Sequence, residues 1–403
     1  MREWKKVKLG ELYEVHNGLS KGRQFFGSGY PFLTFSTVFN NWFLPETLDS
    51  LVQSSEKERT ACSIKRGDVF ITRTSETMDE LGMSSVALKD YPNATYNGFT
   101  KRLRPTTDDV IPEYIGYYLR SKKFRGKFMA FSSMTTRASL ANDDLLSMEV
   151  EIPEKSTQQH IATILSRYDS LIENYQKQIK LLEEAAQRLY KEWFVDLRFP
   201  GHESTKIVDG MPEGWEKKKI KDFVELQSGY AFRSSTFEDG CPYKIVTIKN
   251  VKDGVFESEN VSTIKTVPEK MPNHCFLKDG DILLSLTGNV GRVCMVIGEN
   301  YLLNQRVAKL KTKYPAYTYT LFRSHDMFIT VCNLANGAAQ QNVSPIRIGD
   351  LDIVIANDEL MNKFEGRAGV YIDEIIKHHR QIRLLTEARD RLLPKLMSGE
   401  IAV

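Results

Sequence analysis

The hydrophobic pattern of residues 158–194 is that of one long amphipathic helix. Apolar side chains recur every seven residues in two rows, and neither Gly nor Pro interrupts the stretch. The two rows are Ile161, Tyr168, Tyr175, Leu182 and Leu189, and Leu165, Ile172, Ile179, Ala186 and Trp193. Such a helix would span roughly 50 Å at about 1.5 Å per residue. We therefore expect it to pack against a second long helix, the alternative being a long core helix within one domain.

A matching pattern lies near the C-terminus, in residues 360–397. The segment QIKLLEEA (178–185) returns as QIRLLTEA (381–388), and the same register gives two further rows. These rows are Phe364, Tyr371, His378, Leu385 and Leu392, and Ala368, Ile375, Ile382 and Leu396. Arg389 is the one misfit, and a polar seam residue can mark register or a polar contact. Because a whole domain returns the chain between the two helices, we expect them to form an antiparallel coiled coil.

The segments around the helices repeat each other in order, with small insertions. Matching pairs are Trp4 and Trp215, Gly67-Asp68-Val69 and Gly280-Asp281-Ile282, Asn97 and Asn304, and Leu119-Arg120-Ser121 and Phe322-Arg323-Ser324. Short β-like runs broken by Gly, Asn and Pro alternate with helical patches, which is typical of a mixed α/β (α+β) domain. We therefore predict a pseudo-two-fold tandem repeat: a domain at 1–153, a helix at 154–197, a linker and second domain at 198–356, and a helix at 357–403.

Composition bounds the class of protein. The chain has 403 residues, of which 41% are hydrophobic, as in an ordinary globular protein of two or three domains. The N-terminal MREWKKVKLG has no apolar core, and no segment is long and apolar enough to span a bilayer, so we expect a cytoplasmic protein. The five cysteines include no C-x-x-C pair, which indicates reduced thiols and neither a zinc site nor disulfides.

Two similar domains held on a helical strut are suited to reading two separated features of a long ligand, of which duplex DNA is the obvious one. The formal net charge is +3, whereas residues 154–196 hold six Lys and Arg against seven Asp and Glu, and residues 357–400 hold eight of each. The positive excess therefore lies outside the helices. Any phosphate-binding surface is expected on the domains.

Several segments together resemble one family. ILSRYDSLI (164–172), LLEEAAQRLYKEWF (181–194), VDLRFPG (195–201) and RDRLLPKLMSGEI (389–401) resemble the conserved helical regions of type I restriction-modification specificity (S) subunits. GELYEVHNG (10–18), KDFVELQSGYAF (221–232), GDVFITRT (67–74) and GDILLSLTGN (280–289) resemble their target recognition domains. The resemblance covers essentially the whole chain.

The resemblance implies a non-catalytic, sequence-specific DNA-binding subunit. Each recognition domain would read one half of a split double-stranded DNA target, the helices would set the gap, and two methyltransferase (M) subunits would bind along them. Restriction and translocase (R) subunits would join that core. No cofactor is expected in this chain; S-adenosylmethionine, ATP and magnesium would bind partner subunits, and the complex would be an adenine methyltransferase and endonuclease.

The chain lacks catalytic signatures of its own. It contains no Pro-Pro dipeptide, which the Asn/Asp-Pro-Pro-aromatic motif of adenine methyltransferases needs, and no G-x-x-x-x-G-K-[ST]. We interpret the F-x-G-x-G of residues 25–29 as a turn. We interpret Glu216-Lys217-Lys218 as a charged domain entry rather than a nuclease site, because no suitably placed Asp precedes it. His378 and His379 are interpreted as core or interface residues, so no catalytic or metal-binding residue is predicted.

Candidate base-reading residues lie at matching places in the two domains. Base edges are read by Arg, Lys, Asn, Gln, Ser and Thr on well-supported loops. The candidates are Arg23, Gln24, Arg73, Thr74, Ser75, Thr136 and Arg137 in the first domain, and Arg233, Ser234, Thr287, Asn289, Gln340, Gln341 and Asn342 in the second. For each, the alternative is a solvated polar loop.

A second class of candidates would neutralise phosphates without regard to sequence. These are Lys101, Arg102, Arg104, Arg120, Lys122, Lys123, Arg125, Lys127, Lys309 and Lys311, and a solvated helix face is the alternative for such clusters. On the helices, the aromatic residues Tyr190 and Phe194 exceed what one seam buries, and we expect them at the interface with the methyltransferase. Two other functions remain open: a scaffold that spaces protein partners without binding DNA, and the specificity half of a fused restriction-methylation enzyme.

Overall fold

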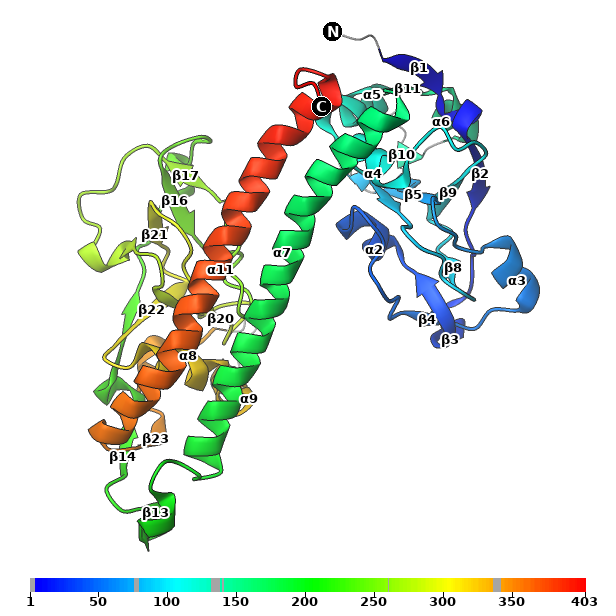
Figure 1. Ribbon diagram of the computed structural model, residues 1–403. Helices are drawn as coiled ribbons and strands as arrows, with labels where there is room; N and C mark the ends of the chain where they lie inside the picture. The colour runs from blue at the N-terminus through cyan, green and yellow to red at the C-terminus, as the bar shows by residue number, and fades with distance from the viewer. Residues whose placement is uncertain (1–3, 76–79, 132–137, 140, 260, 336–341) are drawn as a thin grey trace. The chain divides into compact units, whose positions relative to one another are not determined.

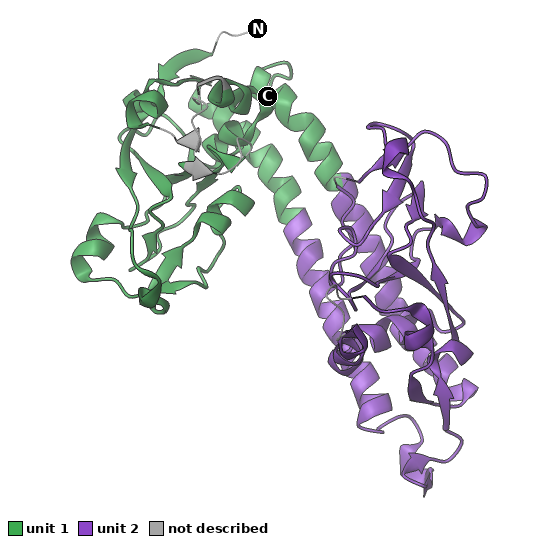
Figure 2. Ribbon diagram, turned by 180° about the vertical axis from the view of Figure 1, so that it is seen from behind, with its two compact units in different colours: residues 1–171, 385–403 green, residues 172–384 purple. Residues whose placement is uncertain are grey.

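The computed structural model describes residues 4–75, 80–131, 138–139, 141–259, 261–335 and 342–403. They form two compact units: unit 1 contains residues 1–171 and 385–403, and unit 2 contains residues 172–384 (Figure 2). The boundary falls within the two long helices, α7 (Lys155–Tyr190) and α11 (Asp358–Ser398), which are drawn in green and orange-red in Figure 1. The sequence-based ranges treat the helices as separate parts, whereas packing divides each helix between the two units.

Unit 1 builds small sheets against short helices. Its strands are β1 (Lys5–Lys8), β2 (Tyr13–Asn17), β3 (Phe26–Leu33), β4 (Leu51–Val52), β5 (Val69–Thr72), β6 (Thr74–Ser75), β7 (Ser84–Val86), β8 (Thr95–Tyr96), β9 (Thr100–Pro105), β10 (Ala138–Ser139) and β11 (Glu149–Ile152). Its short helices are α1 (Leu9–Leu12), α2 (Phe35–Asn40), α3 (Glu56–Ala61), α4 (Pro112–Arg120), α5 (Lys122–Phe131) and α6 (Asn142–Ser147). The largest sheet has the order β2-β9-β5-β7, and β1 pairs with β11.

Unit 2 follows the same plan. Its strands are β12 (Ile207–Val208), β13 (Met211–Pro212), β14 (Glu216–Lys219), β15 (Val224–Ser228), β16 (Tyr243–Val246), β17 (Thr263–Ile264), β18 (Phe276–Leu277), β19 (Ile282–Ser285), β20 (Val293–Met295), β21 (Tyr301–Leu303), β22 (Val307–Thr312) and β23 (Asp352–Ile355). Its short helices are α8 (Pro315–Arg323), α9 (His325–Ala335) and α10 (Pro345–Gly349). Here the order β15-β22-β19-β20 corresponds to β2-β9-β5-β7, and β14 pairs with β23 as β1 does with β11.

The repeated Gly-Asp motif has a local physical cause. Gly67 and Gly280 adopt φ values of 89° and 88°, which glycine tolerates without a Cβ clash. The following carboxylates, Asp68 and Asp281, each accept a backbone N–H three residues earlier at 2.7 Å. The motif thus closes a tight turn before a fully buried strand in each unit, and the tandem repeat predicted from the sequence is confirmed in three dimensions.

The long helices run antiparallel within each unit. In unit 2, Trp193 of the turn that ends α7 packs on Phe364 with ring centroids 5.8 Å apart, and Tyr175 lies 4.9 Å from His378. Later positions of α7 therefore meet earlier positions of α11. In unit 1, the α7 residue Leu165 and the α11 residue Leu396 belong to one buried cluster.

Arg389, the predicted misfit of the seam, makes a polar contact inside unit 1. Its Nη1 donates to Oδ1 of Asp169 at 2.6 Å, and Oδ2 of that carboxylate accepts from the Tyr117 hydroxyl. The guanidinium carbon also lies 5.2 Å from the ring centroid of Trp42. A charged residue in the seam is accommodated because α7 supplies its carboxylate partner, Asp169, and the domain of unit 1 supplies Tyr117 and Trp42.

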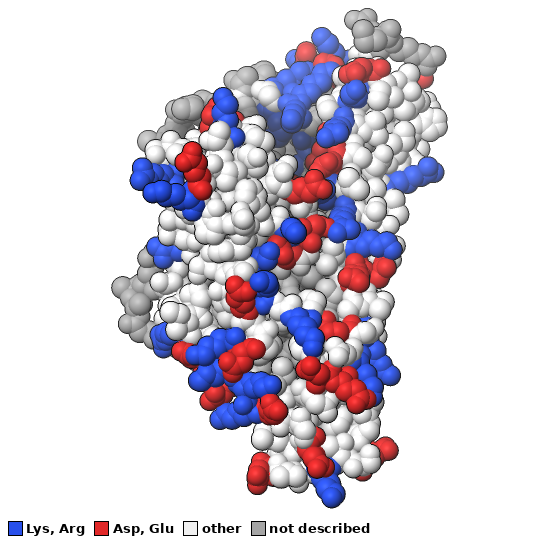
Figure 3. Space-filling model, turned by 90° about the vertical axis from the view of Figure 1, so that its left-hand side faces the viewer, with Lys and Arg blue, Asp and Glu red and all other residues white. Residues whose placement is uncertain are grey.

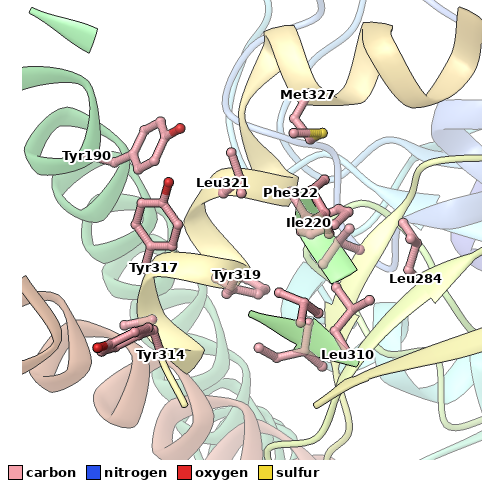
Figure 4. Packing of buried hydrophobic residues seen from close by; sticks show 14 of the residues in the cluster. Tyr190, Ile220, Leu284, Leu310, Tyr314, Tyr317, Tyr319, Leu321, Phe322 and Met327 are labelled. Atoms are coloured by element: carbon pink, nitrogen blue, oxygen red, sulfur yellow. The ribbon is translucent and has the colours of Figure 1, made fainter. Parts of the chain in front are cut away.

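The structure corrects the prediction for Tyr190 and Phe194. Tyr190 is 9% exposed, and its ring centroid lies 5.8 Å from that of Tyr317 of α8. Figure 4 shows the two side chains next to each other. Phe194 is half-buried, and its ring lies 4.9 Å from Tyr317 and 5.0 Å from Phe364. These aromatic side chains pack in the core between the helices and the domain of unit 2, where the prediction had placed them on an outer face of the helices.

No helix in the described part of the chain combines the length and the apolarity that a membrane span requires.

Candidate nucleic-acid interface

The candidate interface lies at one end of the four-stranded sheet in each unit. In unit 1, β2 and β5 end there at Asn17 and Thr72, and β9 begins there at Thr100. In unit 2, β15 ends at Ser228, β19 ends at Ser285 and β22 begins at Val307. The pairings Thr72 with Thr100 and Ser285 with Val307 make these two ends structurally equivalent.

A short antiparallel contact extends each sheet at this end. In unit 1, the backbone of Thr74–Ser75 pairs with that of Ala138–Ser139. In unit 2, Thr287 forms a bridge with Asn342, and the Thr287 hydroxyl donates to Oδ1 of Asn342 at 2.8 Å. Candidates that lie more than fifty residues apart in the sequence thus come together in space. The register makes Thr74 equivalent to Thr287, and Ser139 equivalent to Asn342.

The other described base-reading candidates are accessible. Arg73 directly follows β5. Its Nη1 donates to Oδ1 of the exposed Asn17 at 3.4 Å. Arg23 and Gln24 are exposed on a one-turn helix at Arg23–Phe25, and Arg233 and Ser234 are exposed where a similar turn, Ser234–Thr236, begins. Asn289 is also exposed, whereas Thr287 is 7% exposed and occupied by its bond to Asn342. The Thr287 hydroxyl therefore holds the Asn342 side chain in place.

Four candidates, Thr136, Arg137, Gln340 and Gln341, lie outside the described residues, and for Thr74 and Ser75 only the backbone is described.

The structure corrects the prediction for the basic residues of β9. Arg102 is 2% exposed, and its Nη1 donates to the carbonyl of Ser63 at 2.7 Å. Lys101 is 4% exposed and donates to the Asn142 side chain, and burial lowers its pKa. Arg104 forms an ion pair with the fully buried Asp68 at 2.6 Å. These groups hold strands and turns of unit 1 together and are not free to bind phosphate.

The two arginines of α4 and α5 are likewise committed to the fold. Nη2 of Arg120 donates to the carbonyls of Val38, Phe39 and Asn41 at 2.8 to 3.0 Å, and burial lowers the pKa of Arg120 to about 10. Arg125 donates to the carbonyl of Leu81.

Carboxylates neutralise most of the remaining phosphate candidates. Lys123 and Lys127 both pair with Glu151, Lys309 pairs with Asp281 at 2.8 Å, and the exposed Lys311 pairs with Glu225 at 3.0 Å. On the face shown in Figure 3, Lys and Arg side chains lie beside Asp and Glu side chains over much of the surface. Lys122 is exposed and has no ion-pair partner in the described part of the chain.

The described ranges contain no group of three or more His, Cys, Asp or Glu placed to hold a metal ion. Cys62, Cys275 and Cys294 are buried free thiols, and burial raises the pKa of each.

Comparison with known proteins identifies the family. A family model described as the type I restriction modification DNA specificity domain matches residues 1–184 and 212–357, one match over each repeat. The chain belongs to this family. It is a specificity subunit of a type I restriction-modification system, whose part is the recognition of a DNA sequence. Specificity subunits are in general non-catalytic.

Individual relatives agree with the family. The chain is 26% identical to the type I restriction enzyme MjaIX specificity subunit of Methanocaldococcus jannaschii, over the whole chain and 94% of that protein. It is 22% identical to the HindI specificity subunit of Haemophilus influenzae, over the full length of both. The S subunit structure from M. genitalium matches 98% of the chain and 96% of its own length, with a TM-score of 0.59 at 13% identity. That likeness shows the fold predicted from the sequence.

Proposed function

We propose that units 1 and 2 of this specificity subunit each read one half of a split target in duplex DNA. The long helices set the number of base pairs between the halves, and two methyltransferase subunits bind along them. S-adenosylmethionine, ATP and magnesium bind to partner subunits and not to this chain. Restriction and translocase subunits complete the assembly, which works in the cytoplasm. The DNA specificity family to which the chain belongs supports the first part of this proposal.

One observation carries the proposal of two half-sites. The same sheet order and strand register occur in both units, and each sheet ends in the same paired loops. The polar residues on these loops differ, with the partly exposed Arg73 and the exposed Asn17 in unit 1, and the exposed Asn342 and Asn289 in unit 2. A common frame that carries different hydrogen-bonding groups is what two half-sites of different sequence require.

The exposed apolar residues of the helices support a protein partner there. Leu181 of α7 is 64% exposed and Val370 of α11 is 59% exposed, both within unit 2. Aliphatic side chains that neither the seam nor the domain covers are suited to a protein interface. They replace Tyr190 and Phe194 as the proposed contacts to the methyltransferase.

Co-expression tests the proposal. The chain is produced with the neighbouring adenine methyltransferase subunit, and host DNA is sequenced for methylated adenines. We expect a bipartite motif that appears only when this chain is present. A stable complex that methylates no new motif would refute the DNA-reading function and favour a scaffold.

A further inference from the structure

A turn at the reading end of each sheet is built by the same hydrogen bonds in both units. In unit 1 the turn is Asn97–Thr100, between β8 and β9; in unit 2 it is Asn304–Val307, between β21 and β22. Six backbone N–H groups find equivalent acceptors. The unit 1 bonds, with their unit 2 equivalents in parentheses, are Leu19 N to Tyr96 O (Tyr230 to Leu303), Asn97 N to Leu33 O (Asn304 to Val246), Gly98 N to Leu19 O (Gln305 to Tyr230), Phe99 N to Asn97 Oδ1 (Arg306 to Asn304), Thr100 N to Asn97 O (Val307 to Asn304) and Arg73 N to Phe99 O (Leu286 to Arg306).

A pair of glycines allows the close crossing beneath this turn. A Cβ on Gly18 would lie 2.1 Å from the carbonyl oxygen of Asn97, and one on Gly229 would lie 2.3 Å from that of Asn304. Neither position tolerates a side chain without displacement of the turn. The backbone at the tip is therefore fixed in both units by hydrogen bonds and by close packing.

The tip residue is the part that differs. Phe99 and Arg306 occupy equivalent positions. Each donates its backbone N–H to the side chain of the Asn two residues earlier. The carbonyl of each accepts the backbone N–H of the residue that follows β5 in unit 1 or β19 in unit 2. Phe99 is 62% exposed, which is unusual for a phenylalanine. Arg306 is exposed, and its guanidinium has no partner in the part of the chain that the structure describes.

The tips lie next to the base-reading candidates. The N–H that bonds to the Phe99 carbonyl belongs to Arg73, whose guanidinium also contacts Asn17. The residue bonded to the Arg306 carbonyl, Leu286, directly precedes Thr287 and accepts the N–H of Val343, the residue after Asn342. Each tip thus projects from the centre of the loops that the proposed function assigns to DNA.

We propose that Phe99 and Arg306 are paired specificity-determining residues. Phe99 reads thymine in the half-site of unit 1 through apolar contact with the 5-methyl group. Arg306 reads guanine in the half-site of unit 2 by donating two hydrogen bonds to O6 and N7. These are the contacts that an exposed aromatic ring and a free guanidinium make in the major groove. The inference rests on the proposed function, because it presupposes that the units read half-sites.

Methylated-adenine sequencing of variants tests the pairing. Wild type first gives the bipartite motif and shows which bases belong to each half. We expect Arg306→Ala to lower the discrimination for guanine at one position of one half-site by about 10- to 100-fold, which corresponds to about 1–3 kcal/mol. The bases read in the other half-site should stay unchanged. Arg306→Lys keeps the charge but loses the fork, so it should also relax that position. Phe99→Ala should relax one thymine position in the opposite half.

A binding assay isolates the methyl contact. The purified complex with the methyltransferase is titrated with the wild-type duplex and with a duplex in which uracil replaces that thymine. Loss of the methyl group from the DNA should lower the affinity of the wild-type complex about three- to fivefold. The affinity of the Phe99→Ala complex should be the same for both duplexes. Lys6→Ala removes an exposed cation of β1, which pairs with β11 outside the four-stranded sheet. It serves as the control that should retain both half-sites.

The outcomes separate the two proposals. If wild type methylates no bipartite motif, the proposed function fails. If wild type gives a bipartite motif and the folded variants keep it unchanged, or if both halves weaken uniformly, the proposed function stands and the pairing of Phe99 with Arg306 is refuted.

Discussion

Replacing Phe194 by alanine tests whether the aromatic residues at the end of α7 belong to the core of unit 2. The Phe194 ring lies 4.9 to 5.8 Å from the rings of Tyr190, Trp215, Tyr317 and Phe364. Truncation of a fully buried Phe costs about 3–5 kcal/mol. Because Phe194 is only half-buried, we expect the free energy of unfolding to fall by about 3 kcal/mol.

That loss should be visible in thermal unfolding. For a unit of this size, about 1 kcal/mol shifts the Tm by about 2–4 °C, so Phe194→Ala should lower the Tm of unit 2 by about 6–12 °C. Intrinsic fluorescence follows the transition, because Trp193 and Trp215 pack against the ring at 6.5 and 5.8 Å. Leu181→Ala, in α7 and 64% exposed, is the control and should change the Tm by less than about 1 °C. If Phe194→Ala kept the Tm of wild type and lost the methyltransferase, the residue would be a partner contact and the reasoning would be wrong.

Three further predictions follow from the helices. Leu181→Asp should leave the Tm within about 1 °C of wild type and abolish co-purification of the methyltransferase; normal co-purification would exclude this face. Arg389→Met should lower the free energy of unfolding by about 1–3 kcal/mol, because the part-buried Asp169 loses its ion pair at 2.6 Å. In a protein that already carries Asp169→Asn, Arg389→Met should lower the free energy of unfolding by less. If denaturant titrations gave the same loss in both backgrounds, the two residues would not be coupled. For His379, burial and the neighbouring His378 lower the pKa to about 4. The unfolded chain thus binds the proton more readily between pH 4 and 6.5, and stability should fall by up to about 2 kcal/mol as the pH is lowered from 7.5 to 5. His379→Gln should remove that part of the pH dependence, and an unchanged pH profile would assign it to other groups.

The long helices and the repeat could be predicted from the sequence because both depend on periodic or repeated local signals. The seven-residue rows place Leu165, Ile179 and Trp193 in buried positions, as the structure shows. The Gly-Asp motif recurs because its turn is closed by residues three positions apart. Such short-range physics is present in the sequence itself.

The roles of the basic residues could not be predicted in the same way. Arg102 and Arg120 are bound by carbonyls of residues 63 and 38 to 41, which are distant in the sequence. Whether an arginine faces solvent or a cluster of carbonyls depends on tertiary packing. A count of charges therefore indicated a phosphate-binding surface, whereas in the structure these arginines form hydrogen bonds inside unit 1.

Phe194 illustrates the same limit on the helices. The aromatic residues exceed the needs of a two-helix seam, and the sequence-based interpretation assigned the excess to a partner protein. In the structure, the domain of unit 2 itself covers that face with Tyr317.

The tip residues Phe99 and Arg306 have no periodic signal at all. Their equivalence becomes visible only from the strand register and the matched hydrogen bonds. The repeated Asn97 and Asn304, two residues earlier in each case, were the available sequence signal.

The most direct test of the account exchanges one recognition domain for the other. Residues 215–356 are replaced by a copy of residues 4–153, and the methylated motif is determined in the presence of the methyltransferase subunit. Since the two helices run antiparallel and symmetry of the protein is mirrored in the symmetry of its site, the account predicts an inverted repeat of the half-site read by unit 1. An unchanged motif from an intact complex would contradict the claim that each unit reads its own half.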